Sequence, residues 1–418
     1  MTRLRFCMVT TFYPPFNFGG DGIGVQRLSQ ALVRRGHDVT VVHDGDAFVQ
    51  LAGAEPVAAA PDDGVRVVTL RSRAPRLSLL ATHQLGRPVV HRRRLRALLG
   101  DPSIDVINFH NVSLVGGPGV LAVGTALKAY MAHEHWLVCP THVLWRHGRE
   151  RCTGRECVRC VLRHRRPPQV WRYTRSVARH ARHVDIFIAM SAFSAAKHRE
   201  FGFEQPMEVL PYFLPDTPRD TAGAAAPHAR PYFLFVGRLE RIKGLDDVIP
   251  VFRGFPDADL LIAGDGDHGP ALRALADGIP GVRFLGRLAP EALRHYYRHA
   301  RALIVPSVCF ETFGIILIEA FREGVPVIAR RVGPLPEIVE QAGAGMLFDN
   351  AADLRRTVAG FLNAPERRAA LATAGRTAFE RYWTESAVVP AYFRILERAA
   401  RRTGRAGLAE TLREGAAA

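Results

Sequence analysis

The stretch RALIVPSVCFETFGIILIEAFREGVPVIAR (301–330) carries the pattern that decides the fold. An apolar run at 301–307 predicts a buried strand, and a turn around 311–314 separates it from a segment whose apolar residues recur at helical spacing. Gly324 is placed to end that helix, and the run at 326–330 predicts the next strand. A strand, a helix and a second strand in this order predict a unit of a parallel sheet.

The same alternation extends through the whole chain. Apolar runs of strand length lie at 4–10, 37–43, 65–70, 105–110, 128–133 and 184–190, and again at 231–237, 258–264, 282–286, 301–307 and 326–330. They are almost wholly apolar, which is typical of parallel strands covered on both faces. Between the two series, TPRDTAGAAAPHARP (217–231) has the composition of a linker. The sequence therefore predicts two doubly wound α/β domains joined by a hinge.

Composition agrees with an ordinary globular chain. The 418 residues are 48% apolar, which excludes wholesale disorder and a membrane-embedded bundle. The net charge of +16 points to an anionic partner, but 53 of the 56 cationic side chains are arginines, a skew that fits a GC-rich coding sequence. Lys128, Lys197 and Lys243 are the only lysines. Each retained lysine is therefore more informative than an arginine.

Two motifs of the second domain favour a nucleotide ligand. Arg238 and Lys243 follow the apolar run at 231–237, where a fork-shaped and a point-like cation suit a diphosphate; two solvated cations are the alternative. Glu311 precedes the expected helix and Glu319 lies two turns inside it, about 12 Å away at 1.5 Å per residue. Glu319 would take a ribose diol and Glu311 the sugar hydroxyls, with phosphates at the free amides between them. The alternative is a carboxylate that complements the helix dipole and a solvated one.

A glycine-rich loop follows the first strand. Gly19 and Gly20, with Gly22 and Gly24, precede a helix expected to begin near residues 23–26. Amides without a Cβ approach an oxyanion closely, so this loop is a candidate phosphate site; a loop whose glycines only make the turn is the alternative.

Together these motifs resemble the retaining nucleotide-sugar transferases of glycosyltransferase family 4. The resemblance rests on YPPFNFGGDG (13–22), SAFSAAKHREFG (191–202), VGRLERIKG (236–244), IAGDGD (262–267), VRFLGRL (282–288), ETFGIILIEA (311–320) and GVPVIARRVGPLPEIV (324–339). It implies the GT-B architecture, in which two Rossmann-like domains face each other across a cleft. We expect an N-terminal acceptor-side domain at 1–205, a linker at 206–230, a donor domain at 231–384 and a helical tail at 385–418 that crosses back to the N-terminal domain.

The resemblance also implies a role for each matching residue. Donor binding falls to Gly19, Gly20, Arg238, Lys243, Arg287, Leu288, Phe313, Gly314, Ile315, Ile316 and Glu319, with Arg287 and Leu288 bordering the nucleobase. His133 beside the donor sugar and Glu311 become the candidate catalytic residues. His110 and Glu134, which stands where an aspartate is commoner, are candidates on the acceptor side. Such enzymes let the leaving diphosphate take the acceptor proton and need no cofactor or divalent cation for catalysis.

Four cysteines lie close together in the sequence. Cys139, Cys152, Cys157 and Cys160 have the spacing C-x12-C-x4-C-x2-C, and their thiolates could close a tetrahedral structural zinc site. Free or partly buried thiols are the main alternative, and a redox or cluster role is the third.

Arginines crowd the same insertion, which spans 139–183. Twelve lie between 146 and 183, opposed by Glu150 and Glu156 alone. They could dock on anionic lipid headgroups or on a pyrophosphate-bearing lipid acceptor, with Trp136, Trp145 and Trp171 as interfacial anchors. A solvated, arginine-rich helical hairpin is the alternative.

The leading hypothesis is a retaining hexosyltransferase that moves a sugar from a UDP-, GDP- or ADP-linked donor to a glycan or lipid-linked acceptor. The alternatives are another GT-B enzyme, such as an epimerase or a phosphorylase, and a zinc- and arginine-rich nucleic-acid-binding protein, although nucleic acid is the less favoured partner. No apolar stretch approaches the ~20 residues that span a bilayer. We therefore expect a cytoplasmic protein that is soluble or peripheral on the inner face of the membrane.

Overall fold

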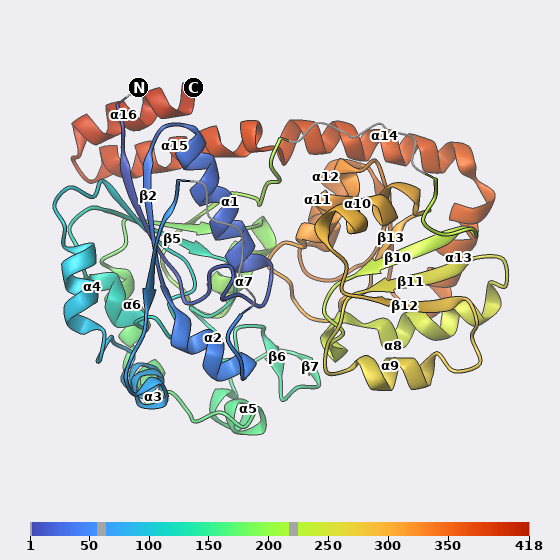
Figure 1. Cartoon of the computed structure of the whole chain (residues 1–418), viewed down its shortest axis with the longest axis horizontal. Helices are drawn as coiled ribbons and strands as arrows, with labels where there is room; N and C mark the ends of the chain where they lie inside the picture. The colour runs from blue at the N-terminus through green and yellow to red at the C-terminus, as the bar shows by residue number, and fades with distance from the viewer. Residues whose placement is uncertain (1, 57–63, 217–224, 418) are drawn as a thin grey trace. The chain divides into compact units, whose positions relative to one another are not determined.

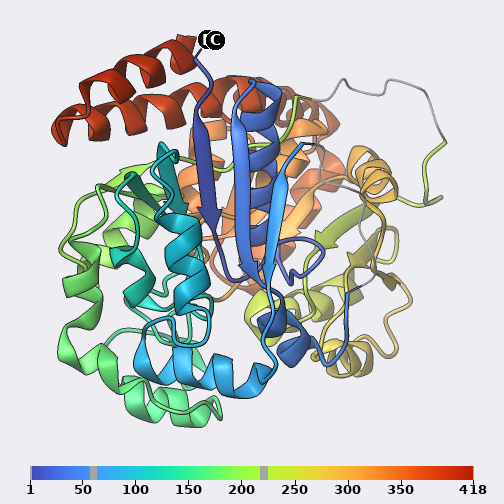
Figure 2. The same cartoon turned by 60° about the vertical axis from the view of Figure 1, so that its left-hand side comes forward.

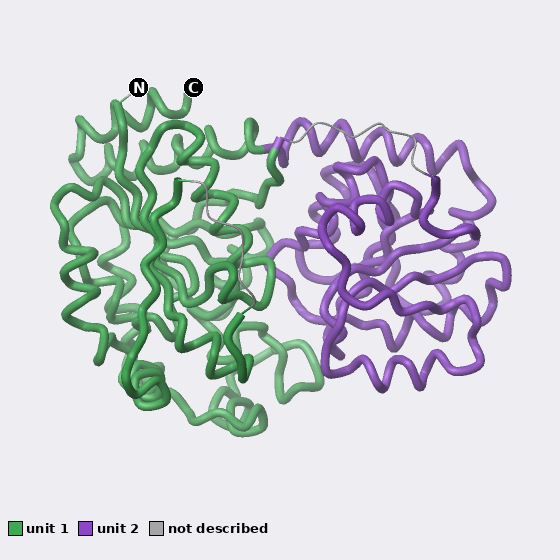
Figure 3. Tube along the Cα trace, in the orientation of Figure 1, with its two compact units in different colours: residues 1–215, 385–418 green, residues 216–384 purple. Residues whose placement is uncertain are grey.

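The computed structural model describes residues 2–56, 64–216 and 225–417. The chain divides into two compact units (Figure 3): unit 1 comprises residues 1–215 and 385–418, and unit 2 comprises residues 216–384. Residues 217–224 of the expected linker lie outside the described residues.

Unit 1 is built on a seven-stranded parallel sheet (Figure 1). In sheet order its strands are β3 (Arg66–Leu70), β2 (Asp38–Asp44), β1 (Arg5–Val9), β4 (Val106–Phe109), β5 (Leu127–Ala132), β8 (Ile186–Ala189) and β9 (Met207–Val209). The six apolar runs predicted in the first half all form strands of this sheet. The edge strand β9 was not predicted, because it has only three residues and is not fully buried.

Helices and a small hairpin complete unit 1. The helices are α1 (Gly20–Arg34), α2 (Gly45–Ala52), α3 (Pro75–Leu85), α4 (Arg92–Leu99), α5 (Cys157–Arg163), α6 (Ser176–Ala181), α7 (Ala192–Glu200), α15 (Glu385–Arg402) and α16 (Ala406–Ala417). The hairpin pairs β6 (Trp145–Arg146) with β7 (Glu150–Arg151), and 3-10 turns lie at Pro118–Ala122 and Val170–Thr174. Helices α15 and α16 lie side by side (Figure 2), and rings of Tyr392 and Phe393 on α15 contact Phe6 of β1.

Unit 2 is built on a six-stranded parallel sheet. In sheet order its strands are β12 (Val282–Gly286), β11 (Asp259–Ala263), β10 (Tyr232–Val236), β13 (Leu303–Val305), β14 (Val327–Arg330) and β15 (Gly345–Phe348). Its helices are α8 (Leu245–Val248), α9 (Gly269–Leu275), α10 (Pro290–His299), α11 (Ile315–Arg322), α12 (Leu335–Ala342), α13 (Ala351–Asn363) and α14 (Pro365–Tyr382), with 3-10 turns at Arg241–Lys243 and Ile249–Gly254. Helices cover both faces of the sheet (Figure 1), and the central strands β10, β11 and β13 are buried between them.

Each sheet has a point at which the chain order reverses. In unit 1, β1 lies between β2 and β4; in unit 2, β10 lies between β11 and β13. The loops that leave the carboxyl ends of β1, β4, β10 and β13 therefore diverge beside a crevice, which is where ligands of open α/β sheets bind. The residues predicted to carry chemistry lie mainly on these loops.

Candidate functional site

The loops after β10 and β13 bring Lys243 and Glu311 together. The two strands are neighbours in the sheet, and Lys243 Nζ lies 2.7 Å from Glu311 Oε1. Ser307, two residues beyond β13, donates its hydroxyl to the same carboxylate oxygen at 2.6 Å. Sequence reasoning selected Lys243 and Glu311 separately and missed Ser307, whose signal was a polar side chain following a buried strand.

Gly244 explains how closely the two loops approach. It has a φ of +74°, and a Cβ at this position would lie 2.2 Å from the carbonyl oxygen of Pro306. Any other residue would strain the backbone and push the loops apart. The glycine after Lys243 thus fixes the spacing between the two loops.

The electrostatics of the pair favour two charged groups. Burial opposes the charge on Lys243, but the Glu311 carboxylate outweighs this, so the pKa of Lys243 lies above its ordinary value. Burial likewise opposes the charge on Glu311, yet Lys243 and the Ser307 hydroxyl hold its pKa below the ordinary value. Arg238 is exposed, pairs with Glu240 at 2.6 Å, and is close enough to influence both groups. The loop that carries Arg238 and Lys243 is therefore cationic, and it lies beside the Glu311 carboxylate, which Lys243 and Ser307 hold in place.

Helix α11 begins directly after the turn predicted at 311–314. Its first residue is Ile315 and Gly314 is its N-cap, so Glu319 lies about one turn inside the helix, not two. The rise of 1.5 Å per residue therefore applies only from Ile315 to Glu319, about 6 Å, and not to the whole interval from Glu311. Glu319 is half-buried and accepts a hydrogen bond from the hydroxyl of Tyr297 on α10 at 3.2 Å.

The other donor-side residues occupy the same end of the unit 2 sheet. Phe313 is buried, while Ile315 and Ile316 form the first turn of α11, whose amide groups lack partners within the helix. Arg287 is exposed and Leu288 half-buried just beyond β12. Since β11 separates β12 from β10, these two residues lie two strands away from the loop of Lys243.

In unit 1, two histidines meet at neighbouring strand ends. His110 directly follows β4 and His133 directly follows β5, and these strands are paired. The Nδ1 atom of His110 lies 2.8 Å from Nε2 of His133, and Nδ1 of His133 is hydrogen-bonded to the hydroxyl of Tyr212. Burial lowers the pKa of His133 to about 3 and that of His110 well below its ordinary value, so both rings are neutral near pH 7. Tyr212 was missed, because nothing in its local sequence marks it.

Glu134 has a partner within its own loop. Its carboxylate is hydrogen-bonded to Nδ1 of His142, and its Oε1 atom is buried without a hydrogen-bond partner among the described atoms. Although Glu134 directly follows His133 in the sequence, its hydrogen-bond partner is His142.

The glycine loop after β1 differs from expectation. Helix α1 begins at Gly20 with Gly19 as its N-cap, not near residues 23–26. A Cβ at Gly22 would lie 2.4 Å from Oδ1 of Asn17, and one at Gly24 would lie 2.4 Å from the ring of Tyr212. Packing therefore accounts for Gly22 and Gly24, while Gly19 and Gly20 stand at the helix start, where amides attract anions.

The four clustered cysteines are free thiols that gather around the β6–β7 hairpin and the start of α5. The backbone amide of His147, in the hairpin turn, donates to Sγ of Cys160 at 3.3 Å, and the amide of Cys152 donates to the carbonyl of Leu144 at 2.8 Å. Burial and then the neighbouring thiols, Cys139 first, raise the pKa of Cys157. In the described parts of the chain, no group of three or more histidine, cysteine or acidic side chains is arranged to hold a metal ion.

The arginine-rich segment is mostly exposed, but its tryptophans are not. Trp136, Trp145 and Trp171 are all buried, so the expectation that they anchor at a membrane interface is wrong in this structure. They form part of the fold instead: Arg172 lies over the rings of Trp136 and Trp171 and donates to the carbonyl of Trp136 at 2.8 Å. No helix in the described ranges is long and apolar enough to cross a bilayer.

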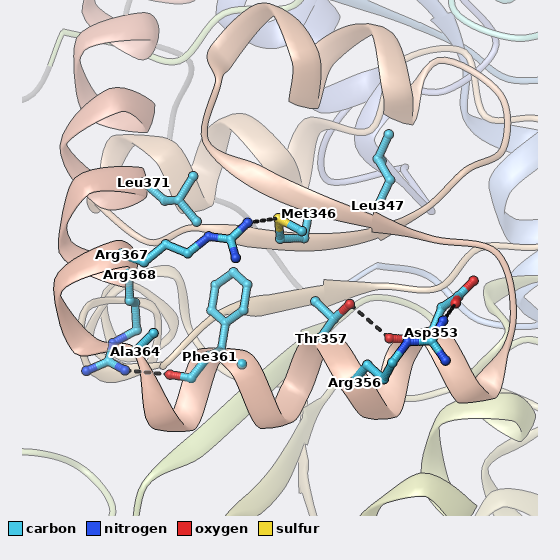
Figure 4. A pocket seen from close by; sticks show the side chains of 11 residues that line it. Met346, Leu347, Asp353, Arg356, Thr357, Phe361, Ala364, Arg367, Arg368 and Leu371 are labelled. Carbon is cyan, nitrogen blue, oxygen red and sulfur yellow. Dashed lines mark hydrogen bonds and ion pairs between the residues drawn. The ribbon is translucent and has the colours of Figure 1, made fainter.

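A pocket of about 260 Å³ lies in unit 2 between β15, α13 and α14 (Figure 4). Arg367 donates to the sulfur of Met346 at 3.1 Å across it, and Arg368 donates to the carbonyl of Phe361 at 2.6 Å. No residue predicted for donor binding or catalysis lines it. The pocket is thus separate from the loops described above.

Each of the two units matches a known protein-family model. Residues 19–212 match the glycosyl transferase 4-like domain, and residues 216–378 match the glycosyl transferases group 1. The first match includes the segment 139–183, on which the nucleic-acid alternative rested.

Two of the curated proteins to which the chain is similar are named as glycosyltransferases. The chain is 31% identical over 224 residues, 48% of its length, to a GDP-mannose-dependent monoacylated alpha-(1-6)-phosphatidylinositol monomannoside mannosyltransferase of Corynebacterium glutamicum. It is 33% identical over 172 residues, 37% of its length, to a D-inositol 3-phosphate glycosyltransferase of Corynebacterium kroppenstedtii. The chain spans 59% and 38% of the length of these two relatives.

Solved structures share the fold over nearly the whole chain. A sucrose-phosphate synthase from Thermosynechococcus elongatus has a TM-score of 0.68 at 20% identity, with 96% of this chain and 99% of that one covered. HepE of Anabaena in complex with UDP has a TM-score of 0.62 at 17% identity, with 96% and 100% covered. With both halves matched by glycosyltransferase families and two Rossmann-like domains in this order, the chain belongs to the group 1, family 4-like glycosyltransferases of the GT-B fold.

Proposed function

We propose that this protein transfers a hexose from a nucleotide-sugar donor to a glycan or lipid-linked acceptor, with retention of the anomeric configuration. The observation that carries the proposal is the contact between Lys243 and Glu311 at the point where the strand order of unit 2 reverses. A cation suited to a diphosphate and a carboxylate suited to sugar hydroxyls thus share one corner of the sheet.

The residues of unit 2 divide the donor between them. Lys243 and Arg238 would neutralise the diphosphate, and the first amides of α11 would add a favourable field. Glu311 would hold the sugar, and Glu319, oriented by the Tyr297 hydroxyl, would take the ribose diol. Arg287 and Leu288 would border the base.

The chemical step needs stabilisation of the leaving group above all. The bond between the anomeric carbon and the diphosphate breaks while the acceptor oxygen bonds to the same face, and the acceptor proton passes to the departing diphosphate. Preorganised cations and amides favour this charge development. In unit 1, Gly19 and Gly20 would contact the phosphate side, and the His110–His133 pair and Glu134 would line the path of sugar and acceptor.

A thermal-shift panel tests donor binding, because a ligand that binds only the folded protein raises its melting temperature. UDP, GDP and ADP are each added alone and as their hexose conjugates. GDP-mannose is included because the name of the Corynebacterium glutamicum relative contains it, and UDP-glucose because HepE of Anabaena has also been solved in complex with it. We expect one nucleotide series to stabilise the protein, and stabilisation by none of them would contradict the proposal.

The surface around α5 supports docking on an anionic bilayer. Ten of the twelve arginines between 146 and 182 are exposed, all but Arg146 and Arg172. Among them stand apolar side chains that are unusually open: Leu162 is 58% exposed and Val170 is 66% exposed, with Val158 and Tyr173 nearby. Cationic and apolar groups on one short surface segment suit the headgroup boundary of an anionic membrane. Acceptors carried by lipids would be reached there.

A structural zinc ion is the second proposal for this segment. Cys139, Cys152, Cys157 and Cys160 would supply four soft ligands, and the amide of His147 donates to one of the sulfurs, as amides do to thiolates in metal sites. Because the described residues do not arrange these thiols as a metal site, binding would draw them closer together. His142, Leu144 and His147 between the first two cysteines all have left-handed φ values of 74°, 48° and 54°, so this loop is held in an unusual conformation. A zinc ion would close the segment and stabilise it, with no role in the chemistry.

A further inference from the structure

The chain of hydrogen bonds through His133 leaves one ring nitrogen without a partner. Tyr212 bonds to Nδ1 of His133, and His110 bonds through its own Nδ1 to Nε2 of His133. The two histidine rings stack with centroids 5.0 Å apart, and the rings of His133 and Tyr212 are tilted with centroids 5.3 Å apart. His110 is 1% exposed, and its Nε2 atom is buried without a hydrogen-bond partner among the described atoms.

The protons of this chain can be arranged in only two ways when both histidines are neutral. If Tyr212 donates to His133, then His133 donates to His110, and Nε2 of His110 carries a proton. If His133 donates to Tyr212, then His110 donates to His133, and Nε2 of His110 is an acceptor. In either case Tyr212 sets the hydrogen-bonding character of His110.

Position separates His110 from the buried pair of His135 and His198. His135 and His198 also form a stacked pair with unpartnered Nε2 atoms, but His198 lies on α7 and neither directly follows a strand. His110 directly follows β4, the neighbour of β1 where the strand order of unit 1 reverses. An unsatisfied buried nitrogen at such a place needs a partner, and a ligand can supply it.

We propose that His110, through Nε2, makes the hydrogen bond to a sugar hydroxyl of the substrate, and that His133 and Tyr212 are positioning residues that hold its ring and set its tautomer. This inference rests on the proposed function. It changes the assignment drawn from the family resemblance, in which His133 itself contacts the sugar.

Two isosteric variants separate this role from a structural one. Asparagine places its polar group near the Nδ1 position of histidine, and glutamine near the Nε2 position. We expect His110→Asn to lose at least tenfold in kcat/KM and His110→Gln to retain more activity, with nucleoside diphosphate affinity unchanged in both. The reverse order would mean that His110 only supports His133, and would overturn the proposal. His198→Asn is the matched control and keeps wild-type kcat/KM.

A second assay shows whether the hydroxyl that His110 contacts belongs to the donor sugar or to the acceptor sugar. If donor hydrolysis without acceptor falls in His110→Asn as transfer does, the donor sugar is the partner; if only transfer falls, the acceptor sugar is. Wild-type rates of both in His110→Asn would overturn this inference alone. Absence of any nucleotide-sugar turnover by the wild-type protein would overturn the proposed function and this inference with it.

Discussion

Lys243 and Glu311 are 68 positions apart in the sequence, yet Nζ of one lies 2.7 Å from Oε1 of the other at the carboxyl ends of two adjacent strands. The pair joins the two halves of the proposed donor site: the group for the diphosphate and the group for the sugar. Each of them holds the other charged and in place before a ligand arrives.

Replacing Lys243 by methionine removes the cation while keeping most of the side-chain volume. We expect affinity for the preferred nucleoside diphosphate to fall about 10- to 100-fold, because a hydrogen bond between charged groups contributes about 1.5–3 kcal/mol. Isothermal titration calorimetry measures this. Lys197→Met is the matched control, since Lys197 forms an ion pair of the same 2.7 Å with Glu200 in unit 1. Equal affinities for the two variants would contradict the assignment.

The ion pair also predicts a pH dependence. Glu311 has a pKa below its ordinary 4.5, so its contribution to stability is present above pH 4.5 and is lost as pH falls through the lower folded-state value. Lys243 has a pKa above its ordinary 10.5, so its contribution is present below pH 10.5 and is lost as pH rises through the higher folded-state value. The difference in free energy of unfolding between wild type and the Lys243→Met/Glu311→Gln variant should be constant between these limits and change outside them. Urea unfolding at several pH values measures it, and a steady slope across neutral pH would count against the pairing.

Gly244→Ala should disturb the site without touching a charge. An added Cβ would meet the Pro306 carbonyl in a left-handed backbone, so we expect a loss of about 3 kcal/mol and weaker nucleotide binding. Gly324→Ala is the control: its φ of +71° is similar, but nothing lies within 4 Å of the added Cβ, so it should cost only about 1 kcal/mol. Thermal unfolding compares them, and equal losses would show that the close approach of the loops is unimportant.

The zinc proposal predicts a metal content. Protein purified without chelators should contain about one zinc per chain by elemental analysis, and Cys157→Ala and Cys160→Ala should lose it. Cys7→Ala, which removes a buried thiol of β1, should keep it. Metal-free wild-type protein after growth and purification with added zinc would refute the site.

The membrane proposal predicts binding that depends on both charge and apolar contact. Wild-type protein should sediment with vesicles that contain phosphatidylglycerol and not with pure phosphatidylcholine, and added salt should weaken binding. A Leu162→Ser/Val170→Ser variant should bind several-fold more weakly. Leu51→Ser, at a site 60% exposed on α2, should bind as wild type does. Equal sedimentation with both vesicle types would contradict the proposal.

The sequence predicted what depends on local pattern. Buried parallel strands have uninterrupted apolar runs, so the ends of β4, β5, β10 and β13 could be located from the sequence. The residues that follow these ends include His110, His133, Lys243 and Glu311. Their meeting followed from the rule that such strand ends share one edge of a sheet.

What could not be predicted depends on packing between distant segments. Tyr212 reaches His133, and Tyr297 reaches Glu319, only because the tertiary fold brings them there. The short strands β9 and β15 have too few apolar residues to stand out. Trp136, Trp145 and Trp171 looked like interfacial anchors, but all three are buried, and the side chain of Arg172 lies over the rings of Trp136 and Trp171.

Turnover of nucleotide sugars followed by NMR tests the proposed sugar transfer directly. Wild type and the Lys243→Met and Glu319→Ala variants are incubated with UDP-, GDP- and ADP-hexoses, and the released diphosphate and the anomeric proton of the product are observed. We expect wild type to consume one donor series and the first product to keep the donor's anomeric configuration, while both variants are at least tenfold slower. No turnover of any donor by wild type, or variants as fast as wild type, would contradict it.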